Sequence, residues 1–383
     1  MDLPYIEREK GKFMEQQTRY TVIGAGHGGK AMAAHLGLMG FPVTLYNRTA
    51  ANVAAIRSRG GVDLTSNMPD VAGFGPLRAV TSDMAEALAE AEVIMVVVPA
   101  SAHRDIATIA TPHLKDGQIV VLNPGRTGGA IEFAKVLRDQ GCQADVTVAE
   151  AETLIYASRS EGPAQARIFR IKDAVPLAAL PATRTGHVLE MLHPAYPHFI
   201  DGGNVLCTSL NNMGAIFHPA LTLLNAGRIE STRGEFQFYI DGVTPSVARI
   251  LESLDRERVT VASALGIRAQ TAMEWLQKAY DARGSDLNEA IHNNSGYYGI
   301  NAPASLEHRY IFEDVPMSLV PIAALGERFG VRVRAMEAII RLACIVHQTD
   351  YWRRGRTLDK LGLENLSVGE IMAYVNEGVL PHD

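Results

Sequence analysis

The chain has 383 residues, of which 47% are hydrophobic and 20% charged, and its formal net charge is −6. This length suffices for two domains with separate cores, and there is no basic run with interleaved aromatic residues, so nucleic acid is not an expected partner. The three cysteines are widely spaced, which argues against a disulfide framework and a cysteine metal site, and we expect no bound metal.

Residues 1–17 are predicted to form an N-terminal extension. They are rich in charge and lack the apolar core of a signal peptide. No apolar run in the chain reaches the ~20 residues of a membrane span, so no membrane partner is expected. These features predict a cytoplasmic protein.

A glycine-rich turn with the spacing Gly24-x-Gly26-x-x-Gly29 lies between a β-rich run at 20–23 and a helical pattern, and a second strand follows at 42–46. The first glycine permits the sharp bend, the second lets the backbone approach a pyrophosphate, and the third lets helix and strand pack closely. The helix N-terminus then offers N–H groups to phosphates. A structural turn is the alternative to the dinucleotide site that we predict, whose cofactor-binding residues are Gly24, Gly26, His27, Gly28 and Gly29.

The end of the second strand bears on the choice of dinucleotide. NAD enzymes usually carry an acid there to bind the ribose 2′-hydroxyl, whereas this stretch reads Asn47-Arg48-Thr49. Arg48 can pair with a 2′-phosphate, and Asn47 and Thr49 can hydrogen-bond to it. The stretch favours NADP, and NAD is the alternative if Arg48 only faces solvent.

Apolar runs within 91–103 and 117–130 predict two buried parallel strands. Ligands bind beyond the carboxyl ends of such strands. Four residues of the loops that follow are therefore expected to contact the cofactor: Pro99, Ala100, Asn123 and Gly125. Arg126, in the second loop, is expected either near cofactor or substrate or in solvent.

A third run, 144–159, carries two acids beside a strand end, Glu150 and Glu152. Such acids can hold a cationic substrate group, and Glu150 is taken as a candidate substrate-binding residue. The alternative, which the sequence slightly favours, is that both acids are solvated.

After residue 204 the pattern becomes helical, as in the stretch 245–266, which begins at a proline and stops at a glycine. The predicted fold class is α/β, with an N-terminal Rossmann-type doubly wound sheet at 18–203 followed by an all-α C-terminal domain at 204–383. This organisation suggests a reductase or dehydrogenase, in which the protein supplies a proton donor or acceptor and holds the substrate. The two lysines after residue 182, Lys278 and Lys360, both read as exposed, so histidine is the better proton-transfer candidate.

The segment 211–225 combines an apolar helical pattern with Asn211, His218 and Asn225 at intervals of seven, which predicts that the three share one helix face. His218 is a candidate general acid/base, the alternative being a histidine satisfied in the core. The two asparagines are candidate substrate-binding residues, the alternative being helix capping or packing against backbone.

Asp314 precedes an apolar helix within 308–322. It is either an N-cap or the acid that orients the His218 ring and stabilises its charged form. Arg309, five residues earlier, can clamp a substrate carboxylate bidentately.

Two further segments are candidates for ligand contact. The turn-rich segment 293–306 is expected to form a substrate loop that Tyr297 or Tyr298 lines. The basic segment 351–358 can reach a phosphate, although a solvated helix end is the favoured interpretation.

The chain resembles the octopine/nopaline dehydrogenase family, the opine dehydrogenases. The resemblance rests on the glycine turn, "NPGRTGGA", "FHPALTLLNAGRIE" and "HRYIFEDVP", which appear in family order and span nearly the whole chain. It implies reductive joining of a 2-oxo acid to the amino group of an amino acid with NAD(P)H. It also implies a catalytic His218–Asp314 pair and a carboxylate-binding role for Arg309. Some members of the family use NAD, whereas the residues Asn47-Arg48 of this chain favour NADP.

The expected function is therefore that of an opine-type dehydrogenase with small-molecule substrates. A hydroxy-acid or ketopantoate-type NADP reductase is an alternative, but it ordinarily needs a catalytic lysine, which the helical domain lacks. A non-catalytic NADP-binding sensor is a second alternative, although the histidine, arginine and aspartate exceed what cofactor binding requires. A homodimer is a possible assembly.

Overall fold

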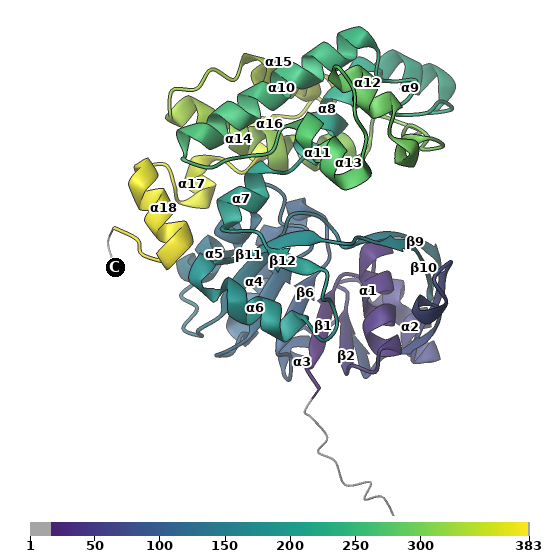
Figure 1. Cartoon of the computed structure of the whole chain (residues 1–383). Coiled ribbons are helices and arrows are strands. Elements are labelled where there is room, and N and C mark those ends of the chain that lie inside the picture. Colours follow the sequence, from purple (N-terminus) through teal and green to yellow (C-terminus); the bar gives the residue numbers. More distant parts are fainter. Residues whose placement is uncertain (1–16, 382–383) are drawn as a thin grey trace, which may run out of the picture.

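The computed structural model describes residues 17–381, so almost all of the predicted extension 1–17 lies outside the described residues. A sheet-containing half and a helical half stack on each other, with the short helix α7 between them (Figure 1). The last strand, β12 (Phe199–Asp201), precedes α7 (Val205–Leu210), and we propose to divide the two halves at the predicted boundary, 203/204.

The main sheet has eight strands in the order β12-β11-β8-β7-β6-β1-β2-β5. All neighbouring strands pair in parallel except β8 and β11, which are antiparallel. The strands are β1 (Tyr20–Ile23), β2 (Val43–Tyr46), β5 (Ala79–Thr81), β6 (Val93–Val96), β7 (Ile119–Leu122), β8 (Thr147–Ala151), β11 (Val175–Leu180) and β12.

Side chains of the central strands alternate between two apolar cores, one on each face of the sheet. In β6, Ile94 and Val96 enter one core while Val93 and Met95 enter the other. Helices α4 (His103–Ala110) and α5 (Gly129–Asp139) cover the first face, and α1 (His27–Leu38) and α6 (Thr185–Leu192) cover the second. The predicted Rossmann-type doubly wound sheet is therefore confirmed. Shorter helices of this half are α2 (Ala54–Arg59) and α3 (Met84–Leu88).

A second sheet, in the order β4-β3-β10-β9, packs on the outer side of α1. Its strands are β3 (Gly61–Ser66), β4 (Gly73–Pro76), β9 (Tyr156–Gly162) and β10 (Gln165–Ile171). Because α1 lies between two sheets, its residues from Gly29 to Gly37 are all buried. This explains why the helix that follows the glycine turn carries mostly small and apolar residues around its circumference.

The second half is helical, as predicted. Its helices are α8 (Gly214–Leu224), α9 (Ala226–Thr232), α10 (Pro245–Ala264), α11 (Ala272–Tyr280), α12 (Leu287–His292), α13 (Arg309–Phe312), α14 (Val320–Arg328), α15 (Arg334–Val346), α16 (Tyr351–Arg354), α17 (Leu358–Leu361) and α18 (Val368–Glu377). The last two return to the sheet half, where α17 packs on α5 (Figure 1). Within residues 17–381, no helix combines the length and apolarity needed to cross a bilayer.

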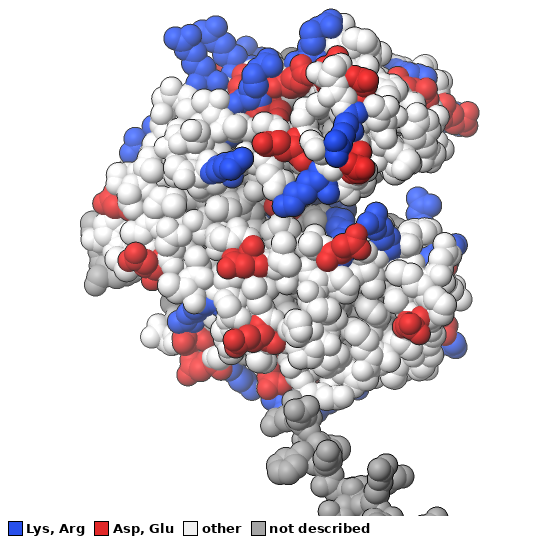
Figure 2. All heavy atoms as spheres, in the orientation of Figure 1, with Lys and Arg blue, Asp and Glu red and all other residues white. Residues whose placement is uncertain are grey.

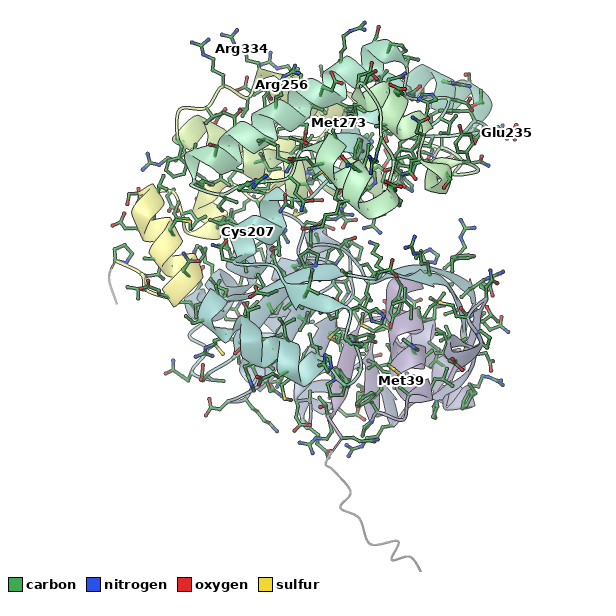
Figure 3. The ribbon with its side chains drawn as sticks, in the orientation of Figure 1. Met39, Cys207, Glu235, Arg256, Met273 and Arg334 are labelled. Carbon is green, nitrogen blue, oxygen red and sulfur yellow. The ribbon has the colours of Figure 1, made fainter. Side chains whose placement is uncertain are left out.

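The predicted single helix face that carries Asn211, His218 and Asn225 is wrong. Helix α7 ends at Leu210, and α8 begins only at Gly214, so Asn211 and His218 lie on different helices. Asn225 is the C-cap of α8. The interval of seven therefore spans an interruption between two helices, the first of which, α7, is marked by Cys207 in Figure 3.

Candidate active site

The glycine turn between β1 and α1 has the shape that a pyrophosphate requires. Gly24 has a φ of 112°, and a Cβ there would lie 2.4 Å from the carbonyl oxygen of Val97. A Cβ on Gly29 would lie 1.8 Å from the carbonyl oxygen of Gly24, so turn and helix touch. A Cβ on Gly26 would meet nothing within 4 Å, and no side chain caps the N-terminus of α1. This open approach to uncapped N–H groups fits the diphosphate of a dinucleotide.

His27 and Gly28 stand at the start of the same helix. The Nδ1 atom of His27 accepts the N–H of Ser160, in β9, at 2.8 Å. Burial lowers the pKa of His27, and the nearby cations Arg159 and Lys30 lower it further. The surroundings of this helix end are thus positive, as an anion site requires, and both residues remain predicted cofactor contacts.

The three residues after β2 differ in what they bind. Asn47 accepts the N–H of Ala25 at 3.3 Å and donates to the carbonyl of Thr49 at 3.0 Å, so its side chain holds this turn against the glycine motif. The side chain of Arg48 is 79% exposed, and its nearest carboxylate, on Asp105, is 4.0 Å away. Such an exposed pair is weak, so the Arg48 guanidinium is available to a ligand phosphate.

The loops after β6 and β7 lie at the carboxyl edge of the sheet, as predicted, and both contact the helical half. The N–H of Ala100, next to Pro99, donates to Oε1 of Glu313 at 3.1 Å. Asn123 precedes a cis proline and donates to the carbonyl of Val121 at 2.9 Å. These loops therefore join the predicted cofactor site to the helical half.

His218 and Asp314 are brought together, although 96 positions separate them in the sequence. Nδ1 of His218 lies 2.8 Å from Oδ2 of Asp314. Asp314 is fully buried, whereas the His218 side chain is 19% exposed, so Nε2 is the ring nitrogen left for a ligand. Tyr310 stacks on the imidazole with ring centroids 4.0 Å apart. Asp314 stands at an N-cap position but makes no capping hydrogen bond, which favours its role as the partner of His218.

Three charged groups surround this pair. Arg126 Nη1 is 3.1 Å from Oδ1 of Asp314, and its Nε is 3.5 Å from Oε1 of Glu313. Arg309 Nε is 2.8 Å from Oε2 of Glu313, and the Arg309 side chain is 47% exposed. Burial raises the pKa of Asp314, but Arg126, His218 and Arg309 outweigh it, so the net pKa is lowered and the carboxyl is ionised. Arg309 thus has an exposed guanidinium beside the pair.

A π-helical turn, Val315–Leu319, directly follows the aspartate. π-turns are rare and often occur at functional sites. The carbonyl oxygens of Pro316 and Met317 accept the N–H groups of Arg356 and Thr127 at 3.0 and 3.1 Å. The turn thus joins the segment that carries Asp314 to the loop after β7.

Arg356 is a structural residue that sequence reasoning missed. The favoured interpretation of 351–358 as a solvated helix end is wrong for this residue, which is fully buried. Its guanidinium binds Glu132 at 2.7 Å and donates to the carbonyls of Ala100, Gly125 and Thr127 at 2.9–3.1 Å. No periodicity distinguishes it from Arg353 and Arg354 in the sequence, since its partners come from distant loops.

Four predicted substrate-binding residues are not part of the cluster around His218 and Asp314. Each is either bound to other protein groups or buried. Asn211 accepts the N–H of Gln270 at 2.9 Å, and Asn225 donates to the carbonyls of Leu221 and Gly242 at 2.9 and 3.1 Å. These contacts match the capping and packing alternative.

Tyr297 is only 6% exposed and stacks on Tyr239 with centroids 4.0 Å apart, whereas Tyr298 is 55% exposed. Glu150 is not solvated, because it is buried at 1% exposure and accepts bonds from Ala130 N–H and the hydroxyls of Thr208 and Ser209 at 2.7–2.9 Å. Burial raises its pKa against these donors.

The neighbouring acid, Glu152, is placed differently. Burial raises its pKa to about 7, and the charges that oppose this shift include Lys172 of the sheet half and Lys278 of α11. Glu152 therefore lies near the junction of the halves. Lys172 donates to the hydroxyl of Thr153 at 2.6 Å, and burial lowers its pKa to about 8.

The two lysines of the helical half differ in their contacts. Lys278 is exposed, as predicted, and Lys360 donates to the carbonyls of Arg353 and Gly355. Among the described residues, no group of three or more His, Cys, Asp or Glu side chains is arranged to hold a metal ion.

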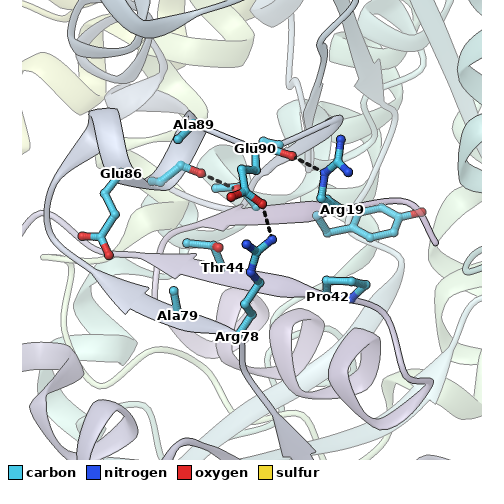
Figure 4. Close-up of a pocket in the computed structure, with 12 residues that line it drawn as sticks. Arg19, Pro42, Thr44, Arg78, Ala79, Glu86, Ala89 and Glu90 are labelled. Carbon is cyan, nitrogen blue, oxygen red and sulfur yellow. Dashed lines mark hydrogen bonds and ion pairs between the residues drawn. The ribbon is translucent and has the colours of Figure 1, made fainter. Parts of the chain in front are cut away.

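A cavity of about 240 Å³ lies at the amino ends of β1 and β2, on the opposite edge from the glycine turn (Figure 4). Arg78 pairs with Glu90 there, and Arg19 donates to the Glu90 carbonyl at 2.7 Å. The carboxyl edge faces a different hollow, between the two halves, with Lys and Arg side chains on both rims (Figure 2). The candidate active site belongs to that hollow.

Comparisons with known proteins agree with this arrangement. Residues 201–347 match the family described as NAD/NADP octopine/nopaline dehydrogenase, alpha-helical domain, and residues 19–151 match the N-terminus of NAD-dependent glycerol-3-phosphate dehydrogenase. An opine dehydrogenase from Arthrobacter sp. (strain 1C) is 39% identical over 94% of this chain and 100% of its own length.

Solved structures share the fold. Octopine dehydrogenase in complex with NADH and agmatine has a TM-score of 0.79 and 21% identity, and the match covers 93% of this chain and 98% of that chain. Yersinopine dehydrogenase with bound NADP⁺ has a TM-score of 0.71 and 15% identity, and the match covers 95% and 99%.

The fold, the glycine turn and the similarity to known proteins together define an NAD(P)-dependent oxidoreductase that acts on CH–NH donors. Within that class, the chain belongs to the opine dehydrogenase family. The predicted family is thereby confirmed, and the non-catalytic sensor is set aside.

Proposed function

We propose that this protein reductively couples a 2-oxo acid to the amino group of an amino acid, and catalyses the reverse, with His218 and Asp314 as its general acid/base pair. The observation that carries the proposal is the 2.8 Å contact between His218 Nδ1 and a buried, ionised Asp314 at the junction of the two halves. A carboxylate on Nδ1 fixes the ring and stabilises its charged form, which leaves Nε2 to exchange a proton with substrate.

The chemistry needs protons at two points. The amine nitrogen adds to the carbonyl carbon and loses a proton while the carbonyl oxygen gains one, which gives a carbinolamine. His218 then donates a proton to the departing hydroxyl, so that water leaves and the protonated imine forms. The hydride that reduces the C=N bond would come from the nicotinamide of bound NAD(P)H. Asp314 stabilises the imidazolium before each proton is given and stays ionised itself, because Arg126 lies against its other oxygen.

Arg309 is proposed to bind a substrate carboxylate. Its Nε is held by Glu313, and its side chain is half-exposed beside Tyr310, which stacks on His218. A guanidinium fixed at one nitrogen keeps its remaining N–H groups for bidentate binding. Glu152, half-buried near the junction, is better placed than Glu150 to meet a cationic amine, since the oxygens of Glu150 already accept protein donors.

NADP is proposed as the preferred cofactor, and NAD as the alternative. Support comes from the absence of an acid at Asn47-Arg48-Thr49, directly after β2, and from the 79% exposure of the Arg48 side chain. A free guanidinium at this place matches a 2′-phosphate better than a ribose hydroxyl. The predicted cytoplasmic location and the homodimer stay predictions.

The test follows nicotinamide oxidation with a grid of 2-oxo acids, each with and without a panel of amino acids. Oxidation only when both partners are present is the expected result, whereas oxidation with an oxo acid alone would assign a hydroxy-acid reductase. His218→Ala is expected to lose turnover by about 10²–10⁴-fold while the Kd for NADPH stays unchanged. His187→Ala, at an exposed position on α6, is the matched control. Full turnover in His218→Ala would exclude the proposed pair.

A further inference from the structure

Arg126 has an uncommon backbone conformation, and its side chain reaches from one half of the molecule to the other. It is a non-glycine residue in the left-handed region, with a φ of 61°, in the loop after β7. Such a conformation is uncommon for residues other than glycine and costs free energy unless the surroundings fix it. Its side chain is only 11% exposed and crosses from the sheet half to the helical half. The sequence left open whether this arginine meets solvent or ligand, and it meets two carboxylates instead.

The contacts of Arg126 are centred on the proton-transfer pair. Asp314 uses Oδ2 for His218, at 2.8 Å, and Oδ1 for Nη1 of Arg126, at 3.1 Å, so one carboxylate bridges the imidazole and the guanidinium. Gly214, at the start of α8, confirms how close the two groups are. A Cβ there would lie 2.6 Å from Arg126 Nη1 and 3.3 Å from His218 Nδ1.

Arg126 differs in this respect from Arg356, the other buried arginine at the junction. Arg356 binds three carbonyl oxygens and Glu132, which is the pattern of a residue that fastens loops. Arg126 instead pairs with Glu313 and Asp314. The positive charge of Arg126 therefore changes the electrostatic potential at the His218–Asp314 pair, whereas the guanidinium of Arg356 holds the loops in place.

We propose that Arg126 is a positioning residue of the catalytic pair: carried by the nucleotide-binding half, its guanidinium holds Asp314 ionised and turned toward His218. The pair is thus complete only where the two halves meet, which ties proton transfer to the half that carries the cofactor. This inference rests on the proposed function of His218 and Asp314.

The groups that set the charge around the pair come from several elements. They are Arg126 from the sheet half, and His308, Arg309, Tyr310, Glu313 and Tyr239 from the helical half. Glu313 is itself paired with Arg309, at 2.8 Å. Removing the Arg126 cation therefore leaves Asp314 with no comparably close cation other than His218, and a proton should then bind the pair more readily.

The test measures the pair without substrate. Diethyl pyrocarbonate modifies neutral imidazole, and peptide mass spectrometry gives the rate at His218 across a pH series. In Arg126→Gln the pH midpoint of this rate is expected to rise by about one unit, the size of shift that a charge removed from within a few ångströms produces. Arg126→Lys keeps the charge and is expected to restore most of the original midpoint. Arg356→Lys, at the same junction, is the matched control and should leave it unchanged.

An unmoved midpoint in a folded Arg126→Gln protein overturns the proposal, as does an equal shift in Arg356→Lys. If Arg126→Gln does not fold, Gly214→Ala gives a second route, because the added Cβ must displace the guanidinium. A rise in the same direction is then expected, and no rise overturns the proposal. Since no substrate is used, these outcomes are independent of the two-substrate assay, whose failure would instead remove the proposed function.

Discussion

Replacing Asp314 by asparagine keeps the size of the side chain and removes its charge. In the native protein this carboxylate makes a hydrogen bond with His218 Nδ1 at 2.8 Å and an ion pair with Arg126 Nη1 at 3.1 Å. The asparagine oxygen can still accept a hydrogen bond from His218, but the neutral NH₂ group then faces the Arg126 guanidinium, which loses its ion pair. Breaking a fully buried ion pair on one side typically costs about 3–5 kcal/mol. We expect Asp314→Asn to be destabilised by an amount in this range.

We expect kcat of Asp314→Asn to fall by more than its loss of stability explains. Without the carboxylate, the imidazolium form of His218 loses its stabilising partner and the ring loses its fixed orientation, which together are worth about 10²–10⁴-fold in rate. The assay is kcat for the coupled reaction, measured beside urea unfolding at several pH values. Binding of NADPH serves as the control, because Asp314 is not expected to contact the dinucleotide.

The pH dependence has a definite sign. Because the pKa of Asp314 is lowered in the folded state, its contribution to stability is fully present above its unfolded pKa, about 3.9, and is lost as the pH falls through the lower folded value. The difference in unfolding free energy between the native protein and Asp314→Asn should therefore shrink as the pH falls below about pH 4. A difference that stays constant through the acid range, or unchanged kcat, would refute this reasoning.

Two further predictions concern single positions. Arg48→Asp should move the ratio of kcat/KM values from NADPH toward NADH by about ten- to a hundredfold, the worth of one charged hydrogen bond, and an unchanged ratio would leave Arg48 without a role in cofactor choice. Gly214→Ala should lower kcat although alanine favours helices, because its Cβ would lie 2.6 Å from Arg126 Nη1; a more stable variant with full kcat would show that the guanidinium can move at no cost.

The sequence alone determined the nucleotide-binding region, because its signal is local. The bend at Gly24, the close contact at Gly29 and the order of strand, helix and strand all follow from neighbouring residues. The pairing of His218 with Asp314 was also predicted, but there the resemblance to a family supplied what spacing cannot. No periodicity relates two residues 96 positions apart.

Periodicity failed where the backbone changed direction. Asn211, His218 and Asn225 are spaced as if on one helix, yet α7 stops at Leu210 and α8 starts at Gly214. The helix is interrupted between these two residues, and a seven-residue interval has meaning only along an unbroken helix. The asparagines instead bind backbone groups within the helical half: Asn211 accepts the N–H of Gln270, and Asn225 donates to the carbonyls of Leu221 and Gly242.

Only the tertiary structure decided the roles of the buried charges. Glu150, Arg126 and Arg356 are each polar residues in loops or at strand ends, for which solvent was a reasonable expectation. In the folded protein, donors or carboxylates from distant segments surround each of them. A charge can be buried only where such partners converge, and convergence depends on how the two halves are packed together. The local sequence therefore specified the turn that fits the dinucleotide, whereas the packing of the halves specified the charges around the catalytic pair.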